Sequence, residues 1–210
     1  SSPVMLLSAI LIKLTSKGPV IFKQERIGLH NKPFKMYKFR SMRVPKKESE
    51  ASEASFKADT DRIFPFGALI RKLKIDELPQ LLNILVNDMA IVGPRPASVD
   101  QVAVMREGKY AVANTVKPGL TGPAALYDYI YGDTIEDPAE YERLVLPTRR
   151  ELEAYYPSHM SAGFDIKMIW WTVICVLAEM FHRQTPKIFR KLKEYAPMDA
   201  ERPEIESAMV

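Results

Sequence analysis

The sequence predicts an α+β fold that is rich in helix and contains one small β-hairpin. Two runs of strand-forming residues, 20–26 and 34–42, are separated by a turn sequence around Gly28. Apolar residues recur at helical spacing through much of the remaining chain. No repeating series of strand and helix is present, so a doubly wound parallel sheet is not expected.

The first predicted element is a short apolar run near the N-terminus. Residues 4–12 are apolar apart from one serine, stop at Lys13 and follow Ser2 and Pro3. Proline fits the first turn of a helix but not its interior, so Pro3 indicates a helix start or a helix break. A run of this length is typical of core, re-entrant or interfacial segments, because a spanning helix needs about 20 apolar residues. No secretory signal is visible.

The next elements are the two strands and a polar segment. The strand runs 20–26 and 34–42 alternate only imperfectly between apolar and polar residues. Residues 45–61 are polar and charged, which predicts an exposed loop or a short solvated helix.

Helical patterns then dominate the middle of the chain. The pattern predicts a short helix over 66–72 and a second helix over 77–86, with leucines on one face. A short buried strand is expected over 89–92, and residues 98–110 have a helical pattern.

The last third is also predicted to be helical. Residues 116–123 form a rigid connection rich in glycine and proline, and residues 138–155 form a helix pair or one helix interrupted at Pro147. An apolar helix is expected over 164–177. A frayed tail is expected from Tyr195 onward.

The composition is that of a folded domain with a mild preference for anionic partners. The 210 residues, 47% of them hydrophobic and 27% charged, suffice for one domain with a substantial core. The net charge of +4 suits nucleic acid, phospholipid and nucleotide partners alike. A single cysteine, Cys175, excludes an internal disulfide, and three scattered histidines do not indicate a zinc site.

The adjacent carboxylates Asp76 and Glu77 are the strongest candidates for chemistry. At the start of the predicted helix, Asp76 would serve as N-cap and Glu77 as a first-turn residue, and this structural interpretation suffices by itself. A helix N-terminus also attracts phosphate and would keep Asp76 ionised. An ionised aspartate can attack phosphorus, and a neighbouring carboxylate can bind Mg²⁺.

Several cations could complete a phosphate site around these carboxylates. Arg95 lies in Gly93-Pro94-Arg95-Pro96, where two prolines stiffen the backbone, and a guanidinium grips phosphate oxygens bidentately. Lys38 and Arg40 would share one strand face, and Arg71 lies just before the carboxylates. Each alone is more simply a solvated surface charge. Gathered around one pocket, they would offset the charge of a diphosphate.

The predicted helix over 164–177 has the composition of an interfacial helix. It contains Trp170 and Trp171, and basic residues follow it. Indole favours the headgroup region, and Lys and Arg attract anionic lipid. A buried core helix is the alternative. Asp165 is interpreted most simply as the N-cap of this helix.

A series of motifs identifies a family resemblance over almost the entire chain. The chain resembles the bacterial sugar transferases, which are monotopic polyprenyl-phosphate phosphoglycosyl transferases that begin glycan assembly on the inner membrane. The motifs that carry the resemblance are Ser2-Pro3, Gly18-Pro19-Val20-Ile21-Phe22-Lys23-Gln24-Glu25-Arg26-Ile27-Gly28, Lys38-Phe39-Arg40-Ser41-Met42, Asp76-Glu77-Leu78-Pro79-Gln80-Leu81, Gly93-Pro94-Arg95-Pro96, Lys117-Pro118-Gly119-Leu120-Thr121-Gly122 and Asp165-Ile166-Lys167.

The resemblance implies a specific reaction. Asp76 would attack the β-phosphorus of a UDP-sugar, releasing UMP and keeping a phosphosugar on the aspartate. Polyprenyl phosphate would then take the phosphosugar. Glu77 would support Mg²⁺ binding or acceptor activation, with Asp76 and Glu77 as the metal ligands. The resemblance assigns the matching positions to the site for the substrate phosphates: Lys38, Arg71, Arg95 and Asp165.

The resemblance also implies domains and a location. Residues 1–17 would be the C-terminal half of a re-entrant membrane helix, with its break at Ser2-Pro3. Residues 18–194 would form the catalytic domain with interfacial helices, and 195–210 a tail. The protein would be monotopic at the cytoplasmic face of the bacterial inner membrane, with membrane phospholipid, UDP-sugar and polyprenyl phosphate as partners.

Other interpretations stay open at this stage. The two carboxylates could act only as metal ligands in direct transfer through a ternary complex. The chain could also be a catalytically inactive, membrane-peripheral interaction module. After Gly122, where many family members carry an arginine, this chain has Tyr129 or its neighbours, so sugar recognition is the least defined property. Nucleic-acid binding is not expected, because no such motif is present. A homodimer is neither indicated nor excluded.

Overall fold

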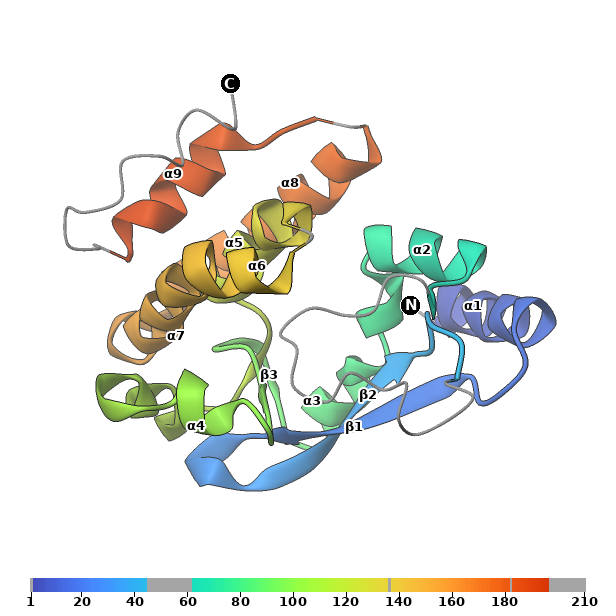
Figure 1. Ribbon diagram of the computed structural model, residues 1–210, viewed down its shortest axis with the longest axis horizontal. Coiled ribbons are helices and arrows are strands. Elements are labelled where there is room, and N and C mark those ends of the chain that lie inside the picture. Colours follow the sequence, from blue (N-terminus) through green and yellow to red (C-terminus); the bar gives the residue numbers. More distant parts are fainter. Residues whose placement is uncertain (1, 45–61, 136, 182, 197–210) are drawn as a thin grey trace.

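The structure is a computed structural model that describes residues 2–44, 62–135, 137–181 and 183–196. A β-hairpin runs along one side of the molecule, and helices gather over one of its faces (Figure 1). This arrangement confirms the predicted helix-rich α+β class.

The hairpin consists of β1 (Ile21–Ile27) and β2 (Pro33–Phe39), paired antiparallel. The tight turn between them places His30 and Asn31 in the left-handed region, with φ of 53° and 60°. A short strand, β4 (Ala97–Ser98), pairs with the other edge of β1. The predicted hairpin is confirmed, and β4 anchors the segment after Arg95 to it.

A second, two-stranded sheet was only half predicted. β3 (Ala90–Val92) pairs in parallel with β5 (Gly119–Thr121). The sequence predicts β3 but treats 116–123 as a connection. A three-residue strand beginning at glycine has little strand propensity of its own, so its pairing depends on tertiary contacts.

Three glycines let the backbones of this second sheet approach closely. A Cβ on Gly119 would lie 2.1 Å from the Gly93 nitrogen, and a Cβ on Gly122 would lie 2.3 Å from the Gly93 oxygen. The Gly119 nitrogen also donates to the Pro94 oxygen at 2.8 Å. The glycines therefore fix the segment that carries Arg95 against β5.

Gly119→Ala is expected to destabilise the protein by about 1–3 kcal/mol, the usual effect of overpacking, because the added methyl meets backbone atoms that cannot move aside. Thermal unfolding measures this loss. Gly163→Ala is the matched control. It adds the same methyl within a helix, at a position where no heavy atom beyond the neighbouring residues and the local helix backbone lies within 4 Å, so no loss of stability is expected.

The N-terminal helix packs beside the hairpin. α1 (Ser2–Thr15) is helical from the first residue that the structure describes and contains Pro3 in its first described turn. α2 (Pro65–Lys72) packs against α1 around a small core. This core contains Ile12, Phe39, Phe64 and Ile70.

The segment that carries the candidate carboxylates differs from the prediction. A single 3₁₀ turn, η4 (Ile75–Glu77), precedes α3 (Gln80–Leu85), whose N-cap position is Pro79. The prediction that Asp76 is a helix N-cap is therefore wrong. Lys74 adopts the left-handed conformation, with φ of 54°, and turns the chain sharply from α2 into η4.

The predicted helix over 98–110 is also shorter than expected. Only α4 (Val102–Met105) is α-helical, and η5 (Gly108–Thr115) follows as 3₁₀ helix. Gly108, the first residue of η5, has a φ of 57°, a left-handed conformation that favours glycine and does not continue a right-handed helix.

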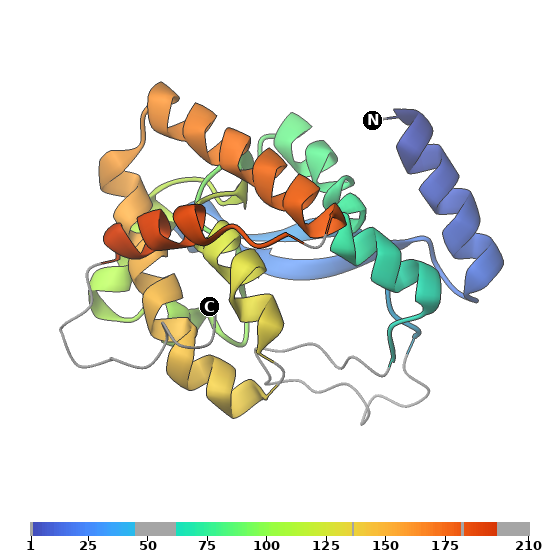
Figure 2. The same ribbon diagram turned by 90° about the horizontal axis from the view of Figure 1, so that it is seen from above.

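Five α-helices complete the described part of the fold, with the 3₁₀ turn η6 (Gly132–Thr134) after the first of them: α5 (Pro123–Ile130), α6 (Pro138–Leu144), α7 (Leu146–His159), α8 (Ala162–Met180) and α9 (Pro186–Glu194). The helix pair predicted over 138–155 and the helix predicted over 164–177 are confirmed. α5 and α9 were not predicted. Figure 2 shows α9 and α5 on one side of α8.

The main core lies among these C-terminal helices. Its fully buried side chains include Leu126, Tyr127, Leu152, Met168 and Leu192. Tyr195, where the tail was expected to begin, stacks on Tyr155 and Trp171, and Ala196 is buried. The packed part of the fold therefore includes both residues. The segments 45–61 and 197–210 lie outside the described residues.

Candidate functional site

The carboxylates Asp76 and Glu77 lie in the 3₁₀ turn η4, between the left-handed Lys74 and α3. Asp76 is 8% exposed. Its Oδ1 atom is buried and has no hydrogen-bond partner among the residues that the structure describes. A buried carboxylate oxygen without a partner is costly for the folded protein, so this atom is a candidate for contact with a ligand.

Glu77 is paired with a cation from the hairpin. The Lys38 Nζ atom on β2 lies 3.0 Å from Oε1 of Glu77, and both side chains are largely buried. Burial opposes the charged form of Glu77, but Lys38, Lys74 and Arg95 outweigh it and hold the pKa of Glu77 well below its usual value. Glu77 is therefore ionised throughout the physiological pH range.

The pKa of Asp76 is shifted in the opposite direction to that of Glu77. Burial, and then the charge of Glu77, raise the pKa of Asp76 to about 6, against the opposing effect of Lys38, Lys74 and Arg71. The expectation that a helix N-terminus keeps Asp76 ionised is therefore wrong in its cause. At neutral pH Asp76 is ionised because the nearby cations limit the effect of burial, and its raised pKa makes it a stronger base than an exposed aspartate.

Arg95 reaches the same region from the segment after β3. Its Nε atom lies 3.8 Å from Oδ2 of Asp128 on α5, and its carbonyl oxygen accepts a hydrogen bond of 3.0 Å from Arg106. Burial alone would lower the pKa of Arg95, but Glu77 and Asp128 raise it. Arg95 is thus held at both its backbone and its side chain.

A buried charge network lies behind Arg95. Arg149 faces Asp128 at 3.7 Å and Glu153 at 3.1 Å, and Arg106 pairs with the other oxygen of Glu153. The Tyr141 hydroxyl donates to Asp128 at 2.5 Å. Because Glu153 is 1% exposed, these ion pairs are shielded from solvent. We call Arg106, Asp128, Arg149 and Glu153 the buried charge network.

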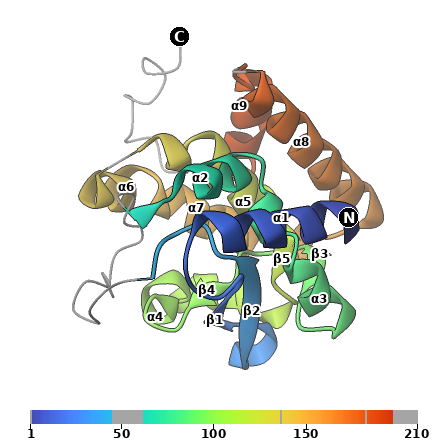
Figure 3. The same cartoon turned by 90° about the vertical axis from the view of Figure 1, so that its right-hand side faces the viewer.

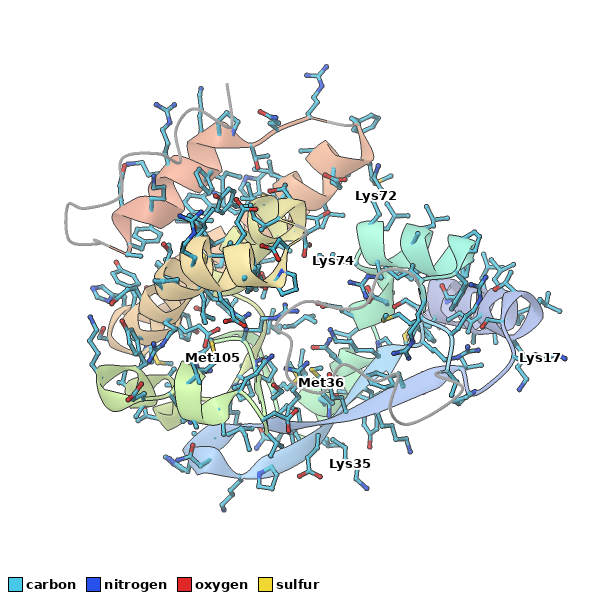
Figure 4. The ribbon with its side chains drawn as sticks, in the orientation of Figure 1. Lys17, Lys35, Met36, Lys72, Lys74 and Met105 are labelled. Atoms are coloured by element: carbon cyan, nitrogen blue, oxygen red, sulfur yellow. The ribbon has the colours of Figure 1, made fainter. Side chains whose placement is uncertain are left out.

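A small pocket opens in front of Glu77 and Arg95, and Asp76 is not among its lining residues. Figure 4 shows Met36 pointing from β2 towards this central region, whereas its neighbour Lys35 points away. The residues that line the pocket include Arg26, Met36, Lys38, Glu77, Arg95 and Gly119. Three cations and one carboxylate thus converge on it, an arrangement that suits a polyanion.

Three predicted residues, Lys38, Arg71 and Arg95, lie near the carboxylates, and two lie elsewhere. Lys38 contacts Glu77, and Arg71 is close enough to lower the pKa of Asp76. Arg40 instead donates to the carbonyl oxygens of Pro19 and Ser16 and to the Ser16 hydroxyl, so it holds the end of α1.

Asp165 is also outside the pocket lining. Its Oδ1 atom accepts a 2.9 Å hydrogen bond from the Tyr156 hydroxyl, which also lies 3.1 Å from the Val92 oxygen at the end of β3. The prediction that Asp165 is an N-cap is wrong, since Ser161 caps α8 and accepts from the Phe164 nitrogen.

Sequence reasoning missed Lys74 as a site residue. Its Nζ atom lies 4.3 Å from the ring centroid of Tyr129 and 3.5 Å from Asp133, and its charge favours ionisation of both Asp76 and Glu77. Figure 4 shows Lys74 in the space between α2 and the α5–α6 region. Its position just before the carboxylates was the only sequence signal.

The two carboxylates can hold a divalent cation only with help from a substrate. The described residues contain no cluster of three or more metal-ligating side chains. Asp76 has a buried, unpartnered oxygen and Glu77 adjoins it, so both can supply hard oxygen ligands. Mg²⁺ is commonly bound by one or two carboxylates together with substrate phosphates and water. The residues present therefore fit Mg²⁺.

Exposed apolar side chains gather on several helices near the site. On α1, Leu6 and Leu7 are 65% and 58% exposed, and on α3 Leu85 is 80% exposed. On α8, Trp170 is 62% exposed, whereas Trp171 packs against the core and lies under Lys167. Figure 3 shows α3, α8 and the start of α1 along one side of the molecule. No described helix is long and apolar enough to cross a membrane.

Comparison with protein families identifies the family of the chain. The family described as bacterial sugar transferase matches residues 1–179 of the chain. The match includes the hairpin, both candidate carboxylates, Arg95 and most of α8.

Individual relatives are similar over most of the chain. It is 38% identical over 176 residues to "UDP-glucose:undecaprenyl-phosphate glucose-1-phosphate transferase" of Escherichia coli K12, covering 82% of this chain and 36% of the relative. It is 40% identical over 181 residues to "UDP-N-acetylgalactosamine-undecaprenyl-phosphate N-acetylgalactosaminephosphotransferase" of Aeromonas hydrophila, covering 84% and 40%. It is 37% identical over 185 residues to "Uncharacterized sugar transferase EpsL" of Bacillus subtilis, covering 88% and 83%. The chain thus spans well under half the length of the first two relatives.

Proposed function

The chain belongs to the bacterial sugar transferase family, and we propose that it transfers a phosphosugar from a UDP-sugar to a membrane polyprenyl phosphate. The observation that carries this proposal is the buried Asp76, with its unpartnered oxygen, next to Glu77, which lines one pocket together with Lys38 and Arg95. The relatives in Escherichia coli and Aeromonas hydrophila are named for reactions of this kind. Such a reaction starts the assembly of a glycan or polysaccharide.

In the first step, a carboxylate oxygen of Asp76 attacks the β-phosphorus of the UDP-sugar. A new bond forms between this oxygen and phosphorus, while the bond from phosphorus to the bridging oxygen breaks. The bridging oxygen keeps the electron pair and leaves on UMP. The raised pKa of Asp76 and its unpartnered oxygen support this role, since a desolvated carboxylate is a better nucleophile than a solvated one.

In the second step, a phosphate oxygen of the polyprenyl phosphate attacks the same phosphorus. The bond from phosphorus to Asp76 breaks, and the carboxylate leaves with the electron pair. The product is a sugar linked to the lipid through a diphosphate. Asp76 is thereby restored for a new cycle, so no further reactant is needed.

The neighbouring residues bind and orient the phosphates. Lys38 and Arg95 offer an ammonium and a guanidinium to the phosphate oxygens, and Arg71 and Lys74 add positive charge beside Asp76. Asp76 and Glu77 would hold Mg²⁺, which supplies charge neutralisation on the substrate diphosphate when bound. Asp165 orients Tyr156 and the end of β3 from outside the pocket.

The identity of the nucleotide product tests this proposal. Purified protein is incubated with Mg²⁺, a UDP-sugar and undecaprenyl phosphate, with UDP-glucose and UDP-N-acetylgalactosamine as the first donors, and the nucleotides are separated by chromatography. We expect UMP and a lipid diphosphate sugar in equal amounts. Release of UDP would instead indicate transfer of the sugar without its phosphate. No turnover with a panel of UDP-sugars would favour the inactive interaction module.

We propose that the protein acts at a membrane surface. Exposed apolar residues on α1, α3 and α8 form the surface that would enter the headgroup region, with Trp170 suited to the interface. The site would then lie at the cytoplasmic face of the inner membrane, where a soluble nucleotide sugar meets a lipid phosphate. α1 is the segment assigned to one half of a re-entrant helix.

Leu7→Lys is expected to release the protein from liposomes that contain anionic lipid. Leu7 is 58% exposed on α1, and a charge there is costly to insert, by up to ~3 kcal/mol at membrane depth. Flotation through a density gradient measures the bound fraction. Val104→Lys, the same kind of change at a 46% exposed position on α4, is expected to leave binding unchanged. Equal binding of both variants and the unchanged protein would rule out α1 as an anchor.

A further inference from the structure

One face of the β1–β2 hairpin carries positive side chains that the reaction described above does not fully use. Side chains on a strand alternate between its two faces, so Arg26, Gln24 and Phe22 lie on one face of β1. The antiparallel register places Lys38 opposite Phe22 and Met36 opposite Gln24, so these β2 residues share that face. Arg26, Met36 and Lys38 all line the pocket.

Arg26 lies in this pocket with neutral partners only. Its Nε and Nη2 atoms donate to Oε1 of Gln24 at 3.1 and 2.6 Å, and its Nη1 atom donates to the Pro96 oxygen at 3.3 Å. Within the described part of the chain, no carboxylate lies at ion-pair distance from Arg26. Burial, and then Arg95 and Arg149, lower the pKa of Arg26 to about 10, against the opposing effect of Asp100 and Glu77. An anion bound in the pocket would offset both the burial of the Arg26 charge and its repulsion by Arg95 and Arg149.

Lys38 and Arg26 lie at different positions along the hairpin, and Arg95 reaches the pocket from the segment after β3. Lys38 contacts Glu77, so it marks the end of the pocket where the phosphosugar would be transferred. Arg26 lies four residues farther along the register, about 13 Å away at the usual rise of a strand. Arg95 is close enough to influence the pKa of both Glu77 and Arg26. A nucleotide diphosphate extended along this face would meet all three.

The position of Arg26 along the hairpin indicates that its ligand is the nucleotide donor and not the lipid acceptor. α1 joins β1 at Ile21, and Figure 1 shows α1 beyond one end of the hairpin, with the turn at the opposite end. Arg26 is one residue from the turn end of β1. It is therefore remote from the exposed apolar side chains of α1, where a lipid acceptor would enter.

We propose that Arg26 binds the α-phosphate of the nucleotide donor and stabilises the departing nucleoside monophosphate. This inference rests on the proposed function. When the bond between the β-phosphorus and the bridging oxygen breaks, that oxygen stays on the α-phosphate with the electron pair. The charge of this phosphate group then becomes more negative, from −1 to −2. Arg26 would bind the leaving group more strongly than the donor, and such differential binding accelerates the step.

Arg26→Gln tests this role against Lys23→Gln. Lys23 is the matched control because it is an exposed cation on the opposite face of the same strand. The rate of phosphosugar attachment to the protein is measured by rapid quench with radiolabelled UDP-sugar and no acceptor. We expect Arg26→Gln to lower this rate about 10- to 100-fold, the loss of one or two charge-assisted hydrogen bonds. We expect no change in Lys23→Gln.

Binding of UMP and of uridine separates phosphate recognition from a structural effect. Calorimetry on the unchanged protein and both variants requires no turnover. Arg26→Gln is expected to weaken UMP binding about 10-fold or more and to leave uridine binding unchanged. If Arg26→Gln does not fold, Arg26→Lys and Gln24→Leu replace it, with smaller losses expected in the same direction.

Three results would overturn the inference. Equal weakening of UMP and uridine would assign Arg26 a structural role. Unchanged UMP binding with slower transfer from the labelled protein to polyprenyl phosphate would assign it to the acceptor. Unchanged values in every assay would show that Arg26 does not contact the donor or the acceptor. If the unchanged protein binds UMP through Arg26 but forms no label and no product, the proposed function fails while the binding site remains.

Discussion

Asp76→Asn is expected to lower turnover at least about a thousand-fold and to leave the protein folded. Asparagine has nearly the same shape as aspartate but lacks the charged oxygen that attacks phosphorus. The pKa of Asp76 is raised in the folded protein by burial and by Glu77, so ionisation of Asp76 destabilises the fold once the pH exceeds its unfolded value near 4. At pH 7 the neutral amide is therefore expected to leave Tm unchanged or to raise it.

Steady-state release of UMP and a thermal unfolding scan measure the two effects together. Glu142→Gln is a suitable control, because it removes one exposed carboxylate on α6 and is expected to change neither value. Turnover by Asp76→Asn within tenfold of the unchanged protein would contradict a nucleophilic role. It would favour direct transfer through a ternary complex, with the carboxylates serving as metal ligands.

Glu153→Gln is expected to destabilise the protein by about 3–5 kcal/mol, because it leaves Arg106 and Arg149 buried without their shared counter-charge. For a protein of this size, this corresponds to a fall in Tm of roughly 6–20 °C. Activity of the remaining folded protein is expected to fall as well, since Arg106 holds the backbone of Arg95 and Arg149 faces its partner Asp128.

Urea unfolding and turnover measured well below Tm separate stability from activity. Glu151→Gln is the matched control. Glu151 lies two residues earlier on α7 and pairs with Lys109 near the surface, so its loss is expected to cost less than about 1 kcal/mol. Equal small effects of both variants would show that the buried charge network neither stabilises the fold nor positions Arg95.

The elements with strong local patterns were predictable from the sequence. The hairpin β1–β2 follows from two strand-like runs around a turn, and the pair α6–α7 follows from a proline at position 147 that fits only a first turn. The helix α8 follows from its long apolar stretch. These patterns act within a few residues of one another, so periodicity alone reveals them.

The elements that depend on distant contacts were not predictable. β5 has three residues and exists because Gly93 and Gly119 allow close approach of two backbones. Asp76 has the residue type of an N-cap, but the left-handed Lys74 starts a 3₁₀ turn there instead. The residue type of Asp76 alone therefore favours an N-cap, but the backbone conformation of Lys74 rules that role out.

The candidate site also contains contacts that could be predicted from the sequence and contacts that could not. The pairing of Lys38 with Glu77 agrees with the family resemblance, because both residues lie in its motifs. Arg106 and Glu153 are 47 positions apart and leave no local pattern that would reveal their ion pair. Arg40 resembled Lys38 in the sequence, yet its guanidinium binds the end of α1. Only the three-dimensional structure separates these two cations.

The most direct test of the central claim is the intact mass of the protein after reaction with a UDP-sugar in the absence of polyprenyl phosphate. We expect an added mass equal to one phosphosugar, located on Asp76 by peptide mapping and absent in Asp76→Asn. Addition of polyprenyl phosphate should then remove this mass and yield the lipid product. A protein that turns over with both substrates but never carries the added mass would contradict the covalent route.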